Sequence, residues 1–224
     1  IYALSNTSKG YTYNLSLSAK KSFDFGLDLM ASYAFTKSKS LNSGTSSVAQ
    51  SNWQYNYIIG NPNAPELGNS AFNVPHTIRV SAFYTKKWKA NRATTVGLIY
   101  TGSSGAPYSI YYNYDLNGDG GYNDLIFIPT DAQVDQMKFL ANSTYTAEQQ
   151  KANMKAWLGS EDYLKDHRGE YFKRYAANEK FEHHFDFHLS HKIDFLVGKT
   201  MRGLEFSFDI VNAGNMFNKK WGRT

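Results

Sequence analysis

The sequence predicts an all-β protein whose main element is one antiparallel, up-and-down sheet of about six strands. Two observations carry this prediction. Apolar and polar residues alternate with a period of two along six segments, which is typical of strands that present a different environment to each face. The connections between these segments are alternately short and long. The six segments are residues 11–20, 25–36, 77–85, 94–101, 181–195 and 203–211.

The first three segments show the alternation clearly. One face of the first carries Tyr11, Tyr13, Leu15, Leu17 and Ala19. One face of the second carries Phe25, Leu27, Leu29, Ala31, Tyr33 and Phe35. One face of the third carries Ile78, Val80, Ala82 and Tyr84. The intervening positions are mostly Ser, Thr, Asn, Lys, Asp and Arg, so each segment is expected to be a strand with one apolar and one polar face.

The last three segments extend the pattern. The fourth is weaker, with Val96, Leu98 and Tyr100 on the apolar face. The fifth is the longest, with Phe181, Phe185, Phe187, Leu189, Ile193 and Phe195. The sixth has Leu204, Phe206, Phe208 and Ile210. At about 9–15 residues these strands are longer than the 5–6 residues common in soluble sheets.

The connections distinguish a membrane barrel from a soluble sandwich. Short turns are expected at 21–24, 86–93 and 196–202, with Trp88 inside the second of them. Roughly forty residues separate the second and third strands, and roughly eighty separate the fourth and fifth, so every long connection leaves the same end of the sheet. Outer-membrane barrels are built in this way, with short periplasmic turns and long extracellular loops. The alternative is a soluble sandwich in which the apolar face packs on a core.

If the sheet is part of a membrane barrel, one face meets lipid and the other meets the lumen. Lipid-facing positions are expected to include Tyr13, Leu15, Leu27, Leu29, Val80, Leu98, Phe187 and Phe206. Lumen-facing positions are expected to include Asn14, Ser16, Asp28, Arg79, Asp186, His188 and Glu205. Aromatic residues near the strand ends suit the girdles that such barrels place at the membrane interfaces.

Composition narrows the class of protein. The chain of 224 residues has no cysteine, which excludes a disulfide framework, thiolate metal sites and cysteine catalysis. No apolar run approaches the length that a membrane helix needs. The aromatic content of 16% argues against disorder, and the net charge of +5 is too mild to indicate nucleic-acid binding. No nucleophile–base frame is recognisable, so an enzyme is not expected.

The longest connection, predicted to be an extracellular loop over residues 102–180, contains two further features. Helices are expected at 130–140 and 146–158, the second beginning with a capping box at Thr146 to Gln149. The segment Asp115-Leu-Asn117-Gly-Asp119-Gly120 matches the first half of an EF-hand calcium loop. A calcium ion is therefore a candidate ligand of Asp115, Asn117, Asp119 and Asp124, although the twelfth position is Ile126 and the alternative is an ordinary polar turn.

Two other clusters are assigned to structural roles. His183, His184, His188 and His191 suggest a metal, but His184 and His188 are about 13 Å apart on a strand, so a polar lumen wall is favoured. Basic residues also surround Trp88, namely Lys86, Lys87, Lys89 and Arg92. A solvated periplasmic turn explains them better than nucleic-acid binding, because most aromatic residues lie on the opposite face from the polar ones.

Several segments, in this order and spacing, resemble TonB-dependent outer-membrane transporters of the Oar-like and SusC-like group from Bacteroidota. They are residues 2–11 (YALSNTSKGY), 70–76 (SAFNVPH), 100–108 (YTGSSGAPY), 115–120 (DLNGDG), 123–129 (NDLIFIP), 167–169 (HRG) and 209–223 (DIVNAGNMFNKKWGR). The resemblance spans almost the whole chain. It implies a barrel of about 22 strands, of which residues 1–224 would be a late part without the plug and the final strand.

The resemblance also implies a function and partners. Such a protein would import a bulky nutrient, an oligosaccharide or a peptide, with energy relayed by TonB through an N-terminal part, and would reside in the bacterial outer membrane. The expected partners are TonB, a SusD-like surface lipoprotein and outer-membrane lipid, with no nucleic acid. No cofactor is expected apart from structural calcium. The alternative is a non-transporting outer-membrane or surface β-module whose long loops bind a partner. Six strands alone leave two open edges, which lipid does not tolerate.

Overall fold

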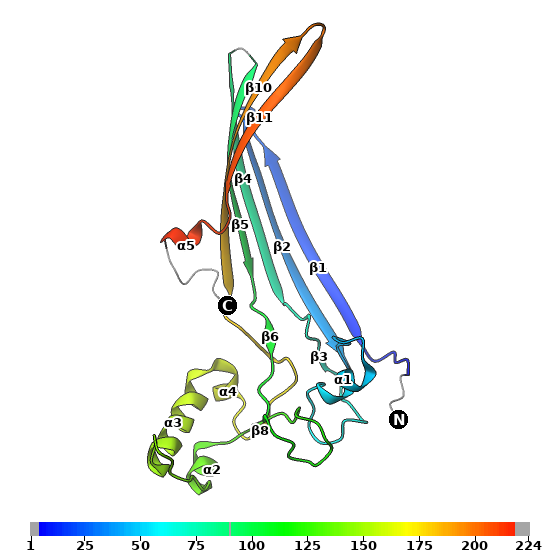
Figure 1. Cartoon of the computed structure of the whole chain (residues 1–224), viewed down its shortest axis with the longest axis vertical. Coiled ribbons are helices and arrows are strands. Elements are labelled where there is room, and N and C mark those ends of the chain that lie inside the picture. Colours follow the sequence, from blue (N-terminus) through cyan, green and yellow to red (C-terminus); the bar gives the residue numbers. More distant parts are fainter. Residues whose placement is uncertain (1–4, 90, 218–224) are drawn as a thin grey trace. The chain divides into compact units, whose positions relative to one another are not determined.

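The structure is a computed structural model that describes residues 5–89 and 91–217. Its six long strands follow each other in one antiparallel sheet, in the order β1-β2-β4-β5-β10-β11 (Figure 1). Their bounds are β1 Tyr11–Ser22, β2 Leu27–Ser40, β4 His76–Trp88, β5 Arg92–Ser103, β10 Glu182–Val197 and β11 Thr200–Ile210. All six predicted strands are confirmed, and their spatial order equals their order in the chain.

The shorter elements lie in the connections and after the last strand. They are α1 Ala49–Gln54, β3 Gly68–Asn69, β6 Pro107–Tyr108, β7 Phe127–Ile128, α2 Asp131–Gln136, α3 Ala147–Ser160, α4 Asp162–Asp166, β8 Glu170–Tyr171, β9 Ala177–Asn178 and α5 Gly214–Phe217. Three small pairings involve them: β3 with β2, β6 with β9, and β7 with β8. No helix among the described residues is both long enough and apolar enough to cross a membrane.

Two of the three short turns are tighter than the sequence predicts, and the first is shifted from 21–24 to 23–26. Trp88 was expected in a turn, but it is the last residue of β4 and pairs with Arg92 of β5. Only residues 89–91 separate the two strands, and Asn91 supplies the left-handed backbone that so tight a reversal needs, with φ of 54°. Gly26, in the turn between β1 and β2, has φ of 96°. A β-carbon there would lie 2.3 Å from the carbonyl oxygen of Thr85, so this position requires glycine.

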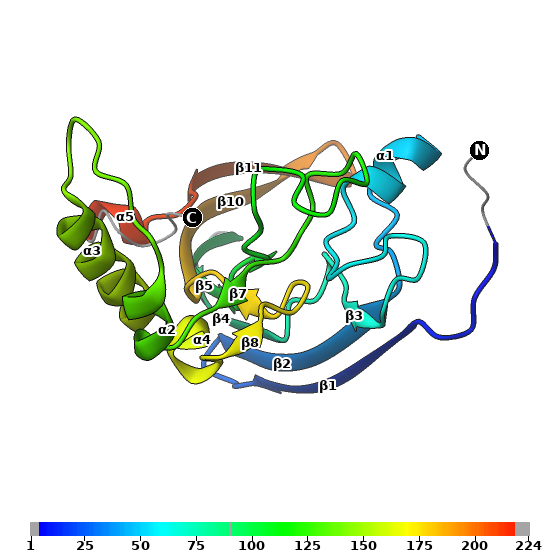
Figure 2. The same cartoon turned by 90° about the horizontal axis from the view of Figure 1, so that it is seen from below.

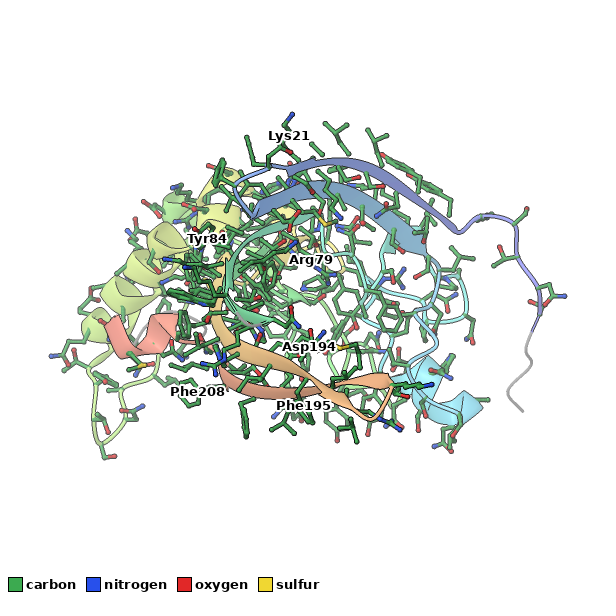
Figure 3. The ribbon with its side chains drawn as sticks, turned by 90° about the horizontal axis from the view of Figure 1, so that it is seen from above. Lys21, Arg79, Tyr84, Asp194, Phe195 and Phe208 are labelled. Carbon is green, nitrogen blue, oxygen red and sulfur yellow. The ribbon has the colours of Figure 1, made fainter. Side chains whose placement is uncertain are left out.

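The sheet has a polar concave face and an apolar convex face. Seen from below in Figure 2, the six strands follow an arc rather than a flat layer. Figure 3 shows Tyr84, Phe195 and Phe208 on the outside of the arc, whereas Arg79 and Asp194 point to its inside. The uninterrupted register of β10 with both β5 and β11 carries this alternation across the sheet. Large apolar side chains on the convex face are exposed, including Leu15, Leu29, Val80, Leu98 and Phe206.

An exposed apolar face of this extent is unfavourable in water, since burial of apolar surface drives folding. In an outer-membrane barrel the same face meets lipid and the concave face meets a wet lumen. Within the described residues, β1 and β11 each pair with one long strand only and form the two edges of the sheet.

The chain divides into two compact units. The strand unit comprises residues 13–37, 74–106 and 179–217, which hold most of the sheet. The loop unit comprises residues 5–12, 38–73 and 107–178, which hold most of the two long connections. The loop unit has a hydrophobic core of its own, in which Ile128, Val134, Leu158, Leu164 and Phe172 are fully buried. The long connections are therefore folded structure rather than extended loops.

Candidate functional site

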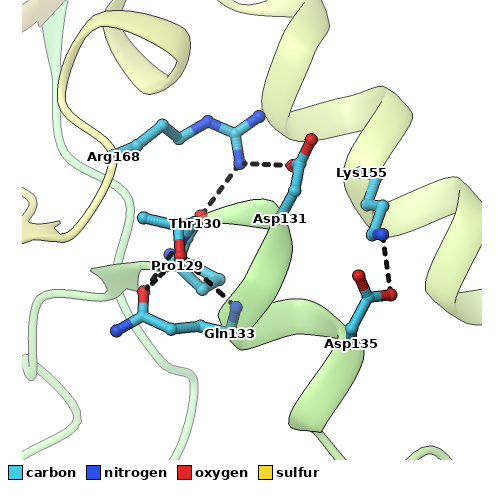
Figure 4. A network of polar contacts seen from close by, with 7 residues as sticks. All are labelled: Pro129, Thr130, Asp131, Gln133, Asp135, Lys155 and Arg168. Carbon is cyan, nitrogen blue, oxygen red and sulfur yellow. Dashed lines mark hydrogen bonds and ion pairs between the residues drawn. The ribbon is translucent and has the colours of Figure 1, made fainter.

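Two helices with capping boxes, α2 and α3, contribute residues to the core of the loop unit. Thr130 and Thr146 each close a capping box, with the threonine side chain accepting from a glutamine backbone N–H three residues later. Figure 4 shows the first box, together with the Lys155–Asp135 ion pair (2.7 Å) that joins α3 to α2. The capping box predicted at Thr146 is confirmed. The helix expected over 130–140 is shorter than predicted, because the chain becomes extended at Met137 and Phe139 packs against the core.

A buried arginine holds the two long connections together. Arg174 is 5% exposed, and its Nη1 donates to Oδ1 of Asn56 at 2.6 Å and to the carbonyl of Leu41. Its Nη2 donates to the carbonyls of Ser40 and Glu66. Among the described residues no carboxylate forms an ion pair with it, and burial lowers its pKa. Its two η nitrogens donate to neutral oxygens, whereas its Nε is buried without a partner in the described part of the chain.

Arg174 forms part of the wall of a cavity of about 490 Å³ in the loop unit. Its lining combines tyrosine rings, amides and charges of both signs, from residues that include Lys39, Tyr57, Glu66, Asn69, Tyr171 and Lys173. Pockets of this volume hold small ligands or single residues of larger ones, and rings with nearby hydrogen-bonding groups suit sugars and peptides. The cavity is a candidate for ligand contact in the described structure.

A cluster of three tyrosines lies at one side of this cavity. The ring centroid of Tyr57 is 4.7 Å from that of Tyr111 and 5.6 Å from that of Tyr175. Burial, and then the two neighbouring phenols, raises the pKa of Tyr57 to about 12. Its hydroxyl therefore stays protonated at physiological pH, and it is engaged in a side-chain hydrogen bond with Tyr111.

The residues predicted to bind calcium lie in one tight loop of the same unit. The carboxylate of Asp115 accepts from the backbone N–H groups of Gly118, Asp119 and Gly120. Asn117 Nδ2 donates to Oδ1 of Asp124 at 3.0 Å, and Asp124 Oδ2 accepts from the N–H of Leu116. All four predicted residues are thus brought together, although no group of three His, Asp or Glu is arranged to hold a metal in the described part of the chain.

The histidines of β10 contact residues on their own and neighbouring strands. On the polar face, His184 Nε2 lies 3.4 Å from Glu182 Oε2, and His188 Nδ1 lies 2.6 Å from Asp209 Oδ1. On the apolar face, His183 and His191 contact Tyr100 and Thr94 of β5. The polar face of β10 and β11 is mostly acidic, with Glu182, Asp186, Asp194, Glu205 and Asp209 against Lys192. These contacts agree with a polar lumen wall.

Sequence reasoning missed Arg174 and the cavity around it. Its partners lie 108 to 134 residues away, so no local spacing in the sequence predicts these contacts. The local sequence at 171–175, YFKRY, does not distinguish this arginine from one in a solvated segment. The predicted segments at 2–4 and 218–223 lie outside the described residues.

Comparison with known proteins agrees with the topology. The chain matches a family model described as an outer membrane beta barrel domain over residues 1–220. Searches of curated proteins and of solved structures gave no significant match. The match covers nearly the whole chain, and the meandering sheet with its apolar convex face and polar concave face agrees with it independently. The chain therefore belongs to the outer membrane beta barrel domain family and resides in the bacterial outer membrane.

Proposed function

We propose that this chain is part of a TonB-dependent transporter that imports a bulky nutrient, an oligosaccharide or a peptide. The observation that carries the proposal is the folding of the two long connections into one unit with its own core and a cavity of about 490 Å³. A receptor must present a pre-formed concave surface to its ligand, and such a surface costs less ordering entropy on binding than a mobile loop.

The sidedness and partners follow from the same proposal. The loop unit, which holds residues 107–178 of the predicted loop over 102–180, lies on the extracellular side. The turns at 23–26, 89–91 and 198–199 lie in the periplasm. TonB acts through an N-terminal part of the protein, and a SusD-like surface lipoprotein covers the loops. The strand order supports this arrangement, because it sends both long connections to one end of the sheet.

Uptake by living cells tests the proposal. Cells with the gene deleted are compared with cells that carry the intact gene, using labelled oligosaccharide and peptide mixtures, with and without a protonophore. The deletion is expected to abolish uptake of one substrate class, and the protonophore to abolish the same uptake in intact cells. Surface binding that persists unchanged with the protonophore, without internalisation, would instead establish the non-transporting β-module. Sequence encoded upstream of Ile1 gives an independent check, since a plug with a TonB box is expected there.

A matched pair of variants tests the cavity. Tyr171 lines it and is 47% exposed, whereas Tyr145 is equally exposed and lies outside the lining. Tyr171→Ala is expected to weaken ligand binding at least tenfold, and Tyr145→Ala to leave it unchanged. Equal effects of the two substitutions would remove the cavity from the proposal while leaving transport itself to the uptake assay.

A further inference from the structure

The loop at 115–124 contains buried polar side chains that have no partner among the described residues. Asn123 is 1% exposed, yet neither Oδ1 nor Nδ2 of its side chain accepts or donates a hydrogen bond within residues 5–89 and 91–217. Oδ2 of Asp119 is also buried without a partner in that part of the chain. Buried amides and carboxylate oxygens are unfavourable unless something coordinates them, and two such groups in one ten-residue loop need an explanation.

The two side chains face the same small space. A β-carbon on Gly121 would lie 2.9 Å from Oδ1 of Asn123 and 2.9 Å from Oδ1 of Asp119. Glycine at this position therefore leaves room between an amide oxygen and a carboxylate. No lysine, arginine or histidine of the described residues pairs with Asp115, Asp119 or Asp124, so the negative charge of the loop lacks a protein counter-ion.

Backbone N–H groups of the loop hold its other side-chain oxygens in place. Asp115 Oδ2 accepts from Gly120 N at 3.0 Å, Asn117 Oδ1 accepts from Asp119 N at 3.0 Å, and Asp119 Oδ1 accepts from Gly121 N at 2.7 Å. Gly118 and Gly120 adopt φ of 75° and 86°, which only glycine takes readily. Side chains at alternate positions are thereby gathered on one side of the turn, as an oxygen-lined calcium loop requires.

We propose that this loop binds one calcium ion, with Asp115, Asn117, Asp119 and Asn123 as side-chain ligands. Calcium takes six to eight oxygens, including amides and backbone carbonyls, so the set needs no third converging carboxylate. Asp124 acts as a positioning residue, because its carboxylate is engaged by Asn117 Nδ2 and the N–H of Leu116. The proposal does not depend on transport.

A bound ion here would brace both long connections. Asn117 Nδ2 donates to the carbonyl of Gly60 at 3.0 Å, and Ile58 N donates to the carbonyl of Asn123 at 3.1 Å. Gln54 Nε2 also reaches the carbonyl of Gly120 at 3.3 Å. Ordering of 115–124 is therefore expected to order 54–60 as well.

Terbium luminescence in the full-length protein tests the site, because Tb³⁺ replaces Ca²⁺ and is excited through nearby tyrosines. Tyr114 and Tyr122 flank the ligand residues directly. We expect a saturable tyrosine-sensitised signal that Ca²⁺ displaces at or below about 1 mM, the weak end of extracellular calcium sites, and that Mg²⁺ does not displace at the same concentration. Limited proteolysis between residues 54 and 60 should slow when calcium is added.

Three variants separate ligation from folding. Asp119→Asn is expected to weaken Tb³⁺ binding tenfold or more. Asn123→Leu replaces the unpartnered amide with an apolar group of similar size, so it should leave the metal-free protein intact but weaken Tb³⁺ binding at least fivefold. Asp166→Asn removes an exposed charge elsewhere in the loop unit and should change nothing. The absence of a saturable signal, equal displacement by Mg²⁺, or unchanged binding in both Asp119→Asn and Asn123→Leu would overturn the proposal.

Discussion

Nη1 of Arg174 donates a hydrogen bond of 2.6 Å to Oδ1 of Asn56, although 118 residues separate them in the chain. Asn56 belongs to the connection between β2 and β4, and Arg174 to that between β5 and β10. Asn56 Nδ2 in turn donates to the carbonyl of Leu41, which also accepts from Arg174. One guanidinium thus links backbone near residues 40–41 and 66 and the side chain of Asn56 to the second long connection.

Replacement of this arginine should loosen the loop unit. Arg174→Ala leaves several buried oxygens without donors, which we expect to cost about 3 kcal/mol or more. Arg174→Lys keeps the charge but cannot reach the four oxygens at once and should be nearly as damaging. Lys173→Ala is the control, since Lys173 pairs only with Glu170 at 3.4 Å among the charged residues described. Protease cleavage within 38–73 should accelerate in both arginine variants and stay at the wild-type rate in the control.

Alkaline pH should also weaken the loop unit, through Tyr57. Its pKa in the folded protein is about 12, above the ordinary value of 10.0. The stabilisation that this provides is complete below about pH 10 and is lost as the pH rises towards 12, because the unfolded chain releases the proton first. Ultraviolet titration at 295 nm should show late ionisation with Tyr57 as the latest step, because burial also raises the pKa values of Tyr163 and Tyr175. Tyr57→Phe should remove this late step and flatten the loss of protease resistance between pH 10 and 12; an unchanged titration curve would contradict the assignment.

The strands could be predicted from the sequence, whereas the cavity could not. Alternation such as Leu27, Leu29, Ala31 and Tyr33 is a local signal, because both environments of a membrane strand are imposed on neighbouring residues. Strand ends were less predictable: Trp88 continues β4 because cross-strand pairing with Arg92 extends the ladder beyond the apolar pattern. Arg174 depends on oxygens from distant segments, and a single sequence carries no signal for such a contact.

The loop at 115–124 could be predicted from the sequence only in part. Its spacing of oxygen-bearing residues is local, so the sequence identified Asp115, Asn117, Asp119 and Asp124 together. The buried state of Asn123 is not local, since it arises from the pairing of 123–125 with Ile58. The proposed calcium site therefore includes Asn123, and in that proposal Asp124 supports Asn117 through the hydrogen bond from Asn117 Nδ2.

Removal of the α3 cap should have a small and local effect. The side chain of Thr146 accepts from Gln149 N at 3.2 Å, and Gln149 Oε1 accepts from Thr146 N at 2.9 Å. Thr146→Ala loses the first of these bonds and should destabilise the helix by about 1 kcal/mol. Amide hydrogen exchange in 147–151 is expected to accelerate about fivefold. Thr144→Ala removes a hydroxyl from an exposed residue just before the helix and should leave the exchange unchanged.

The two faces of the sheet give the sharpest test of membrane insertion. Val80 and Ser81 are neighbours on β4, and the pleat sends their side chains to opposite faces. Val80 lies on the convex face with Tyr84, and Ser81 on the concave face with Arg79. An arginine at position 80 must enter the hydrocarbon region, whereas one at position 81 enters a polar lumen that already holds charged groups.

Val80→Arg should therefore lower the free energy of unfolding by about 2–4 kcal/mol, and Ser81→Arg by much less. Urea titration of the full-length protein in lipid vesicles measures both free energies. The two variants add the same charge at neighbouring positions of one strand. The two substitutions change β-propensity differently, but the whole propensity scale spans only about 1 kcal/mol. A difference of about 2 kcal/mol or more between the variants therefore reports the environment of each face. Equal destabilisation would show that both faces meet the same medium, and a larger loss in Ser81→Arg would place the lipid on the concave side.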